Sequence, residues 1–489
     1  EKRPKEMLRP LRRLADVARR PAAAAGAQRA SVRWMSDEVP AEAWLQPKTQ
    51  VTTLPNGLRV ATQQTFDETA TIGLWIDSGS RYETKETNGA AHFLEHMAFK
   101  GTNKRNRLQL EKEIEDIGGH LNAYTSREQT VYYAKVHKQD TKQALDVLSD
   151  IILNSQITPG AIEEERAVIL REMEEVEKSM EEVVFDRMHQ SAFRDCSLGY
   201  TILGPVENIQ NMRREHLLDY IKRNYKADRM VIAAAGPVDH KEIVRQAEQF
   251  FGKVATTPDD LVQPVEEKPY FVGAQLLYRN DEMGPTAYIA VAWEGVPWKS
   301  PDAPAFMVMQ SIIGSYRKED LSNIVPGQVS GNMTIQRIAT KQMVGCADAF
   351  SAFNTHYKDT GLYGWYAECD EVAVTHCTQD MMFGNTCMAY NITEEEVNRA
   401  KLQLKTQMLG ALDSTTSIAE EIGRQLLVYG RRMPVAEFIK RIDVIDSEEI
   451  KRVAWKYLHD REINIVGMGP LHGMESYPKV RNQTMLYRY

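Results

Sequence analysis

The stretch YKADRMVIAAAGP, residues 225–237, returns near the end of the chain as YLHDREINIVGMGP, residues 457–470. Both copies contain Tyr-x-x-Asp-Arg, a short run of small and β-branched residues, and Gly-Pro. A short apolar run that ends in Gly-Pro predicts a buried strand followed by a turn. Because the whole pattern recurs about 232 residues later, the sequence predicts a duplicated unit.

Two further pairs of segments repeat in the same order and at similar spacing. Thr69–Ile72 resembles Thr286–Ile289, and Ile157-Thr158 returns as Ile392-Thr393. We therefore expect two homologous domains of about 220 residues. Strands alternate irregularly with long helices, so the expected fold class is α+β, with an antiparallel-rich sheet covered by helices in each domain. Together the domains would form half of a clam-like cleft.

The expected linker is the segment 256–270, which is rich in Pro, Asp and Glu. It would separate an N-terminal domain, 37–255, from a C-terminal domain, 271–489. Within the first domain the patterns predict a strand at 70–76, a hairpin of 120–125 with 130–136, and helices at 139–154, 160–190 and 214–224.

The first 36 residues differ from the rest in charge. They carry a formal charge of +7, and the remaining residues carry −15. Leucines spaced among arginines predict a basic amphipathic helix, which is typical of a mitochondrial targeting segment. The alternative is a basic arm that binds a membrane surface or another subunit.

Composition excludes several classes of protein. The acidic body disfavours nucleic acid and suits a basic partner or substrate. No run approaches the roughly 18–20 apolar residues of a membrane-spanning helix. Five cysteines form no CxxC pair, so we expect reduced thiols in an intracellular compartment and no cysteine metal ligand.

One short segment carries the chemistry. The stretch NGAAHFLEHMAFKG predicts a buried helix capped by Asn88 and ended by Gly101. His92 and His96 are four residues apart, so they share one helix face and can bind one cation. Glu95 is placed to contact a water at the metal instead of the metal. The alternative is a pair of structural histidines.

The acidic helix expected at 160–190 supplies candidates for a third ligand. Most of its ten acids are interpreted as a solvated face. Glu165 and Glu172 differ because they are seven residues apart and interleaved with apolar residues. We expect them to lie in the core, where a carboxylate needs a cation.

The second half lacks these ligands. The counterpart of the histidine helix, 301–315, contains no histidine, and offsets of 235 and 233 from Glu172 reach Gln407 and Lys405. We therefore expect one site, in the first half, and a second half that shapes the cleft.

His92-x-x-Glu95-His96 followed by Glu172 resembles the pitrilysin-type inverted-zinc metallopeptidases. Three further stretches, FLEHMAFKGT (93–102), LNAYT (121–125) and GRQLLVYGRR (423–432), resemble the mitochondrial processing peptidases within that family. The resemblance runs from about Val51 to Gly469. It implies that His92, His96 and Glu172 bind one Zn²⁺ and that Glu95 is the general base.

The resemblance also implies supporting and substrate-binding roles. Glu165 would support the metal site, and Glu182 with Asp186 would receive a substrate arginine near the cut. Phe99 would line the pocket for the next large residue, and Asn122 with Ala123 would form the edge strand that binds extended substrate. Alternatively, Glu182 and Asp186 are surface acids and Phe99 belongs to the core.

Partners and location follow from the same resemblance. It implies a homologous α subunit, basic presequence peptides as substrate, and residence in the mitochondrial matrix, free or on the matrix face of the inner membrane. The absence of a glycine-rich loop favours the β-type chain. The functions in play are presequence cleavage, with or without membership of respiratory complex III, a purely structural core subunit of that complex, and general peptide degradation.

Overall fold

Strand β6 (Met230–Gly236), which the repeated stretch predicts, is buried along its whole length. Its run of apolar residues suits a position with neighbours on both sides. β6 pairs in parallel with β2 (Arg59–Gln64) and antiparallel with β3 (Thr69–Ile76). The pairing of β6 is seen in a computed structural model of the chain. This structure describes residues 47–258, 268–317 and 347–486. The expected targeting segment 1–36 and most of the expected linker lie outside these residues.

Each half of the chain builds a six-stranded sheet, and the two sheets share one plan. The first has the order β1-β2-β6-β3-β5-β4 and the second β7-β12-β8-β11-β10-β9. In both, one parallel pair is followed by antiparallel pairs, so the expected α+β duplication is confirmed. The remaining strands are β1 (Gln50–Thr53), β4 (His120–Thr125), β5 (Thr130–His137), β7 (Ala274–Arg279), β8 (Thr286–Glu294), β9 (Ser315–Arg317), β10 (Ala347–His356), β11 (Gly361–Asp370) and β12 (Asn464–Gly469).

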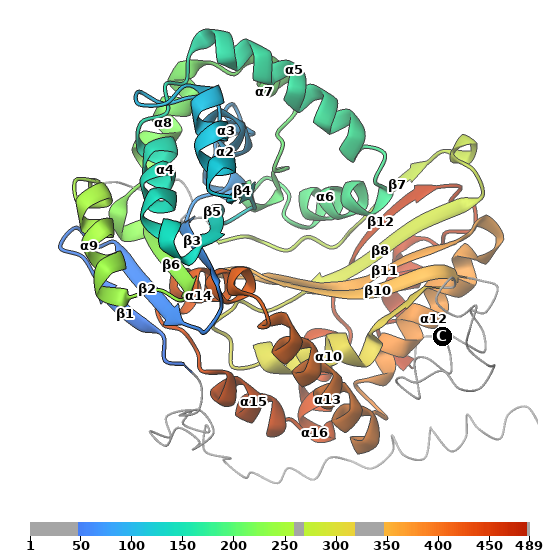
Figure 1. The fold of residues 1–489 in the computed structure, drawn as a ribbon. Helices are drawn as coiled ribbons and strands as arrows, with labels where there is room; N and C mark the ends of the chain where they lie inside the picture. The colour runs from blue at the N-terminus through green and yellow to red at the C-terminus, as the bar shows by residue number, and fades with distance from the viewer. Residues whose placement is uncertain (1–46, 259–267, 318–346, 487–489) are drawn as a thin grey trace, which may run out of the picture. The chain divides into compact units, whose positions relative to one another are not determined.

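Helices cover the sheets, as Figure 1 shows. Those of the first half are α2 (Ala90–Ala98), α3 (Arg107–Asp116), α4 (Thr141–Leu153), α5 (Pro159–Val176), α6 (Met180–Ala192), α7 (Val206–Asn211), α8 (Arg214–Asn224) and α9 (His240–Phe251). Those of the second half are α10 (Ala303–Ile313), α12 (Val374–Cys387), α13 (Glu394–Ala411), α14 (Thr415–Tyr429), α15 (Val435–Asp443), α16 (Ser447–Tyr457) and α17 (Tyr477–Asn482). Every helix in the described part of the chain is too short or too polar to cross a membrane.

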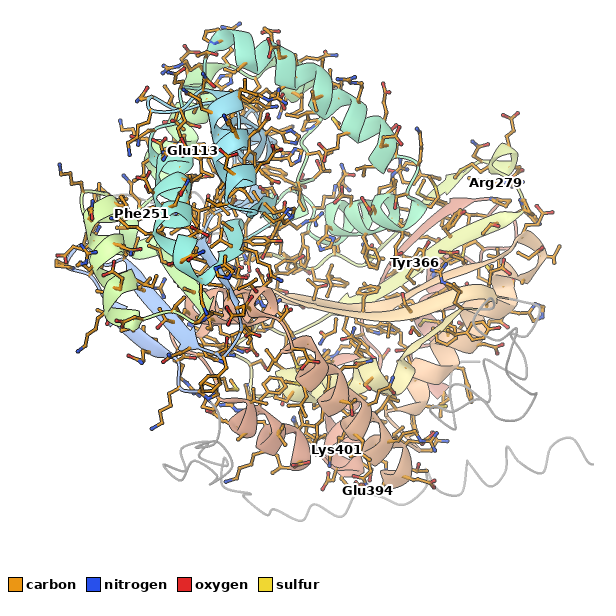
Figure 2. The ribbon with its side chains drawn as sticks, in the orientation of Figure 1. Glu113, Phe251, Arg279, Tyr366, Glu394 and Lys401 are labelled. Carbon is orange, nitrogen blue, oxygen red and sulfur yellow. The ribbon has the colours of Figure 1, made fainter. Side chains whose placement is uncertain are left out.

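Each half contributes one helix that packs on the sheet of the other half. From the first half, α6 packs on β8 and β12 of the second sheet, where Val184 and Met188 are buried. Tyr366 of β11, labelled in Figure 2, lies against Phe185 of α6 with ring centroids 5.9 Å apart. From the second half, α14 packs on β3 and β6 of the first sheet, where its Ile422 lies beside Trp75. The two halves therefore share two apolar interfaces.

This packing explains one wrong prediction. The single helix expected at 160–190 is two helices, α5 and α6, which Glu177–Ser179 separate. α5 packs against α2 of its own half, whereas α6 packs against the second sheet. One straight helix cannot bury its apolar residues against both. Glu181 and Glu182 in the first turn of α6 favour a new helix start there.

Candidate metal centre and active site

Helix α2 carries the histidine motif and is buried, but its start differs from the prediction. Asn88 does not cap it: Gly89, with φ of 104°, is the N-cap residue and makes no side-chain cap bond. Instead, Glu83 accepts hydrogen bonds from the backbone N–H groups of Gly89 (2.9 Å) and Ala91 (2.7 Å). Burial raises the pKa of Glu83 to about 8, although these bonds oppose the rise. Sequence patterns missed Glu83 because a cap six residues away belongs to no capping motif.

Three potential ligands converge between α2 and α5. Nε2 of His96 lies 3.1 Å from one carboxylate oxygen of Glu172, and Nε2 of His92 lies 3.6 Å from the other. One ligand atom from each of the three residues lies within 4.8 Å of the others. The donor types suit zinc, and the separations of 3.1 and 3.6 Å between the imidazoles and Glu172 are close to the roughly 3.3–3.6 Å between ligand atoms of a tetrahedral zinc. Glu172 is 40% exposed, which corrects the expectation that it lies in the core.

Glu165 is buried and contacts the His96 ring at Nδ1, whereas Glu172 contacts it at Nε2. The Glu165 carboxylate lies 3.2 Å from Nδ1 of His96 and 2.5 Å from Nζ of Lys100. A carboxylate that accepts from the second ring nitrogen orients a histidine ligand. Burial opposes protonation of His96, but its bonds to Glu172 and Glu165 outweigh burial and raise its pKa. The adjoining His92 and His96 imidazoles hold the pKa of Glu172 below its usual range.

Glu95, also on α2, contacts the first sheet. Its Oε2 accepts a hydrogen bond of 2.6 Å from the hydroxyl of Thr125, the last residue of β4. Glu95 therefore lies outside the set of three ligands and is held at the end of an edge strand. Thr125 was not singled out from the sequence, because the packing of helix α2 against strand β4 is what brings Thr125 and Glu95 together.

The predicted substrate-binding residues lie on strand β4, directly after helix α2, and on helix α6. Asn122 and Ala123 are on β4, which is an edge strand of the first sheet. Asn122 is exposed and donates to the hydroxyl of Tyr133 at 3.3 Å. Phe99 follows α2 directly and is half-buried against the first core.

Glu182 and Asp186 lie on α6, four residues apart and thus on one face. Glu182 is exposed. Asp186 accepts a hydrogen bond of 2.5 Å from the guanidinium of Arg127, whose side chain is only 10% exposed. An arginine of the chain itself therefore already occupies one oxygen of Asp186. The sequence did not indicate this pair, because its members lie on a turn and a helix that are 59 residues apart.

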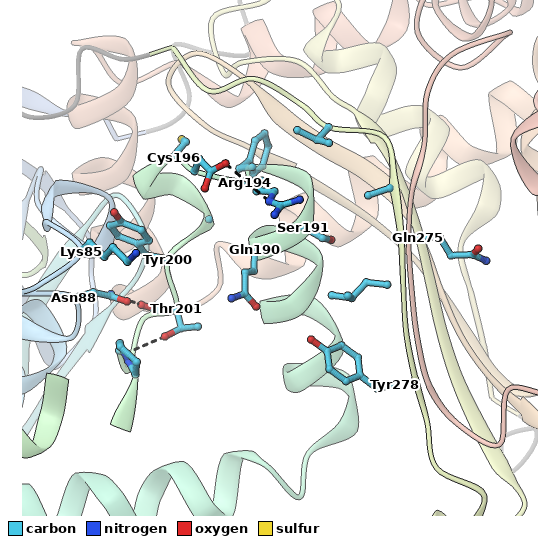
Figure 3. Close-up of a pocket in the computed structure, with 18 residues that line it drawn as sticks. Lys85, Asn88, Gln190, Ser191, Arg194, Cys196, Tyr200, Thr201, Gln275 and Tyr278 are labelled. Carbon is cyan, nitrogen blue, oxygen red and sulfur yellow. Dashed lines mark hydrogen bonds and ion pairs between the residues drawn. The ribbon is translucent and has the colours of Figure 1, made fainter. Parts of the chain in front are cut away.

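A cavity of about 840 Å³ lies elsewhere, between the end of α6, the loop after it and strand β7 (Figure 3). Its lining includes Asn88, Gln190, Arg194, Tyr200 and Tyr278 but none of the residues assigned to the metal centre. Its position alone assigns it no part in the chemistry.

The second half has no equivalent centre among its described residues. α10, the counterpart of α2, carries no histidine, and the three-ligand cluster of α2 and α5 is the one such group in the described chain. Four of the five cysteines are described, and all four are free thiols. Cys346 lies outside the described residues.

Comparison with known proteins agrees with this architecture. Residues 59–206 match the family described as insulinase (peptidase family M16), and residues 211–404 match the peptidase M16 inactive domain. The second match begins before β6, so the boundary between the two matches differs from that between the two sheets. M16 peptidases are generally metal-dependent.

Curated relatives and one solved structure are similar over nearly the whole chain. The probable mitochondrial-processing peptidase subunit beta of Arabidopsis thaliana is 50% identical, with 91% of this chain and 82% of the relative covered. The mitochondrial-processing peptidase subunits beta of Blastocladiella emersonii and Mus musculus are 48% and 45% identical, with 91% and 89% of this chain and 93% and 87% of the relatives covered. A chain of complex III2 from Candida albicans, Inz-5 bound, superposes with a TM-score of 0.78 at 24% identity, covering 90% of this chain and all of that one, and shows the same fold.

Proposed function

This chain belongs to the M16 peptidase family and, within it, to the mitochondrial-processing peptidase β subunits, and we propose that it cleaves N-terminal presequences from imported proteins. The observation that carries the proposal is the meeting of His92, His96 and Glu172 within 4.8 Å, on the helix that also carries Glu95 and on the neighbouring helix α5. Imidazole and carboxylate groups can bind a metal, and the Glu95 carboxylate can act as a general base. The chain is accordingly a metallopeptidase subunit of mitochondria.

We assign the metal as zinc, held by His92, His96 and Glu172. When bound, zinc supplies a Lewis acid that polarises a peptide carbonyl and lowers the pKa of water. Glu165 orients His96 through Nδ1, and Thr125 holds Oε2 of Glu95. We assign proton transfer to Oε1 of Glu95, which takes a proton from the attacking water and gives it to the leaving amine.

The edge of β4 supports binding of an extended peptide. Asn122 and Ala123 lie on a strand whose outer side carries no partner strand among the described residues, and added strands bind mainly through backbone hydrogen bonds. A large residue after the cut would pack on Phe99. A substrate arginine would pair with Glu182 and share the carboxylate of Asp186 with Arg127.

The partner, compartment and substrate class are parts of the same proposal. We infer a homologous α subunit, the mitochondrial matrix, and basic presequence peptides, which suit the formal charge of −15 on residues 37–489. The chain's likeness to one from complex III2 favours a second candidate function, a core subunit of that complex, on the ground of fold. The two functions are compatible with one another.

The experiment compares wild type with Glu95→Gln in the native assembly, using an arginine-bearing presequence peptide. The matched control is Glu164→Gln, which changes an exposed glutamate of α5. We expect cleavage by wild type and control, loss of at least about a hundredfold in Glu95→Gln, and equal zinc content in all three. Absence of cleavage by a zinc-loaded, partner-complete wild type would refute the peptidase function and leave the structural core role.

A further inference from the structure

The turn Ser126–Gln129, which joins β4 to β5, contacts both sides of the site. Immediately before it, Thr125 donates to Glu95 at 2.6 Å. Within it, Arg127 donates to Asp186 at 2.5 Å. A displacement of this turn would therefore move the general base, the arginine-binding carboxylate and the edge strand together.

The short 3-10 helix Ser80–Tyr82 is hydrogen-bonded to this turn through its backbone. The backbone N–H of Arg81 donates to the carbonyl of Arg127 at 2.9 Å, and that of Ser80 donates to the carbonyl of Ser126 at 3.3 Å. Gly79 lets the two segments approach, because a Cβ at that position would lie 2.2 Å from the Ser126 carbonyl oxygen. The side chain of Arg81 is 2% exposed and pairs with Glu128 at 2.6 Å.

The second half of the chain completes this arrangement. Asp359, in the turn between β10 and β11, binds the guanidinium of Arg81 with both oxygens, at 2.9 and 2.5 Å. The backbone N–H of Lys358 donates to Glu128 at 3.2 Å, and its ammonium pairs with Asp77 at 2.6 Å. A bidentate pair between carboxylate and guanidinium restricts orientation more than a single bond does. The turn of the first half is thus held by a turn of the second half, whose described residues contain no such ligand cluster.

We propose that Asp359 is a positioning residue for cleavage, acting through Arg81 and Glu128 on the turn Ser126–Gln129 and so on Glu95. The inference rests on the proposed function. It gives the second half a part in catalysis beyond covering the first sheet. Small misplacements of a catalytic group are enough for large losses of rate, up to about a hundredfold per ångström.

The test is Asp359→Asn, which keeps shape but removes the charge that binds Arg81. The matched control is Thr416→Ala, which removes a different hydrogen bond between the halves, the one that joins the hydroxyls of Thr416 and Thr71 at 3.0 Å. In the native assembly we expect kcat of Asp359→Asn on the presequence peptide to fall about tenfold, with zinc content unchanged. Thr416→Ala should retain wild-type kcat.

A double-mutant cycle separates positioning from simple loss of stability. Thr125→Val removes the bond to Glu95, so in that background Asp359→Asn should lower kcat by less than about threefold. Equal losses in both backgrounds would overturn the proposal, and so would wild-type kcat in Asp359→Asn. If wild type itself does not cleave, the proposed function fails, and amide hydrogen exchange still decides the positioning role. Exchange at residues 120–130 should be faster in Asp359→Asn than in wild type or Thr416→Ala, and equal exchange would overturn it.

Discussion

Helix α14 approaches the first sheet so closely that Gly423 has no room for a side chain. A Cβ at this position would lie 2.1, 2.4 and 2.6 Å from three ring carbons of Trp75, whereas carbon atoms in contact prefer about 3.5–4.0 Å. Trp75 is 1% exposed and donates through Nε1 to Glu420 at 3.1 Å, so its ring cannot move without breaking that bond. We therefore expect Gly423→Ala to push α14 away from the sheet.

The expected loss of stability can be estimated from two opposing effects. Overpacking a core typically costs about 1–3 kcal/mol, and the close contacts at Gly423 place it at the upper end. Alanine in a helix interior gains about 1 kcal/mol over glycine. The net expectation is a loss of about 2 kcal/mol, seen as a lower urea midpoint for the full chain in its native assembly.

Gly410 of α13 is the matched control. It is exposed, and a Cβ added there would have no atom within 4 Å, so Gly410→Ala should stabilise by up to about 1 kcal/mol. Replacing glycine by alanine should therefore lower the free energy of unfolding at position 423 and raise it at position 410. If Gly423→Ala is as stable as wild type, α14 does not pack on Trp75 as described, and the interface between the halves would have to be reconsidered.

Two further predictions concern buried groups. Glu83→Ala leaves the first N–H groups of α2 without their acceptor, so we expect unfolding free energy to fall by about 1–3 kcal/mol and zinc affinity to weaken, whereas the exposed Glu86→Ala should do neither. Burial and the nearby Arg127 hold the pKa of His189 well below its usual value, and neutral His189 accepts from the hydroxyl of Tyr357. Below about pH 6.5 the unfolded chain binds a proton at His189 and the folded chain does not. The contribution of His189 to stability is therefore fully present above that pH. Below it, the free energy of unfolding falls by up to about 1.4 kcal/mol per pH unit. Urea midpoints from pH 7.5 to 5.5 should therefore drop more in wild type than in His189→Gln, and parallel curves would contradict this.

The helix that carries the candidate metal ligands could be predicted because the pattern that reveals it is local. His92, Glu95 and His96 lie within one helix, where a spacing of three or four residues decides which side chains share a face. Glu172 could be proposed because it lies on an acidic helix with apolar residues beside it. The family assignment follows from those motifs and agrees with the M16 matches.

Contacts between distant segments could not be predicted in the same way. Thr125 reaches Glu95 across 30 residues, and Asp359 reaches Arg81 across 278. No periodicity links such positions, so only folding shows that the turn Ser126–Gln129 connects them. The break between α5 and α6 has the same origin, because it depends on which sheet each helix covers.

The sequence by itself determined the duplicated α+β plan and the helix that carries His92, Glu95 and His96, because repeats and helical spacing are properties of the chain order. The tertiary structure decided how the halves depend on one another. Each half covers the other half's sheet with one helix, and Asp359 of the second half binds Arg81 beside the turn Ser126–Gln129 of the first. These contacts depend on apolar burial and charge pairing in three dimensions, which bring together residues that the chain order keeps far apart.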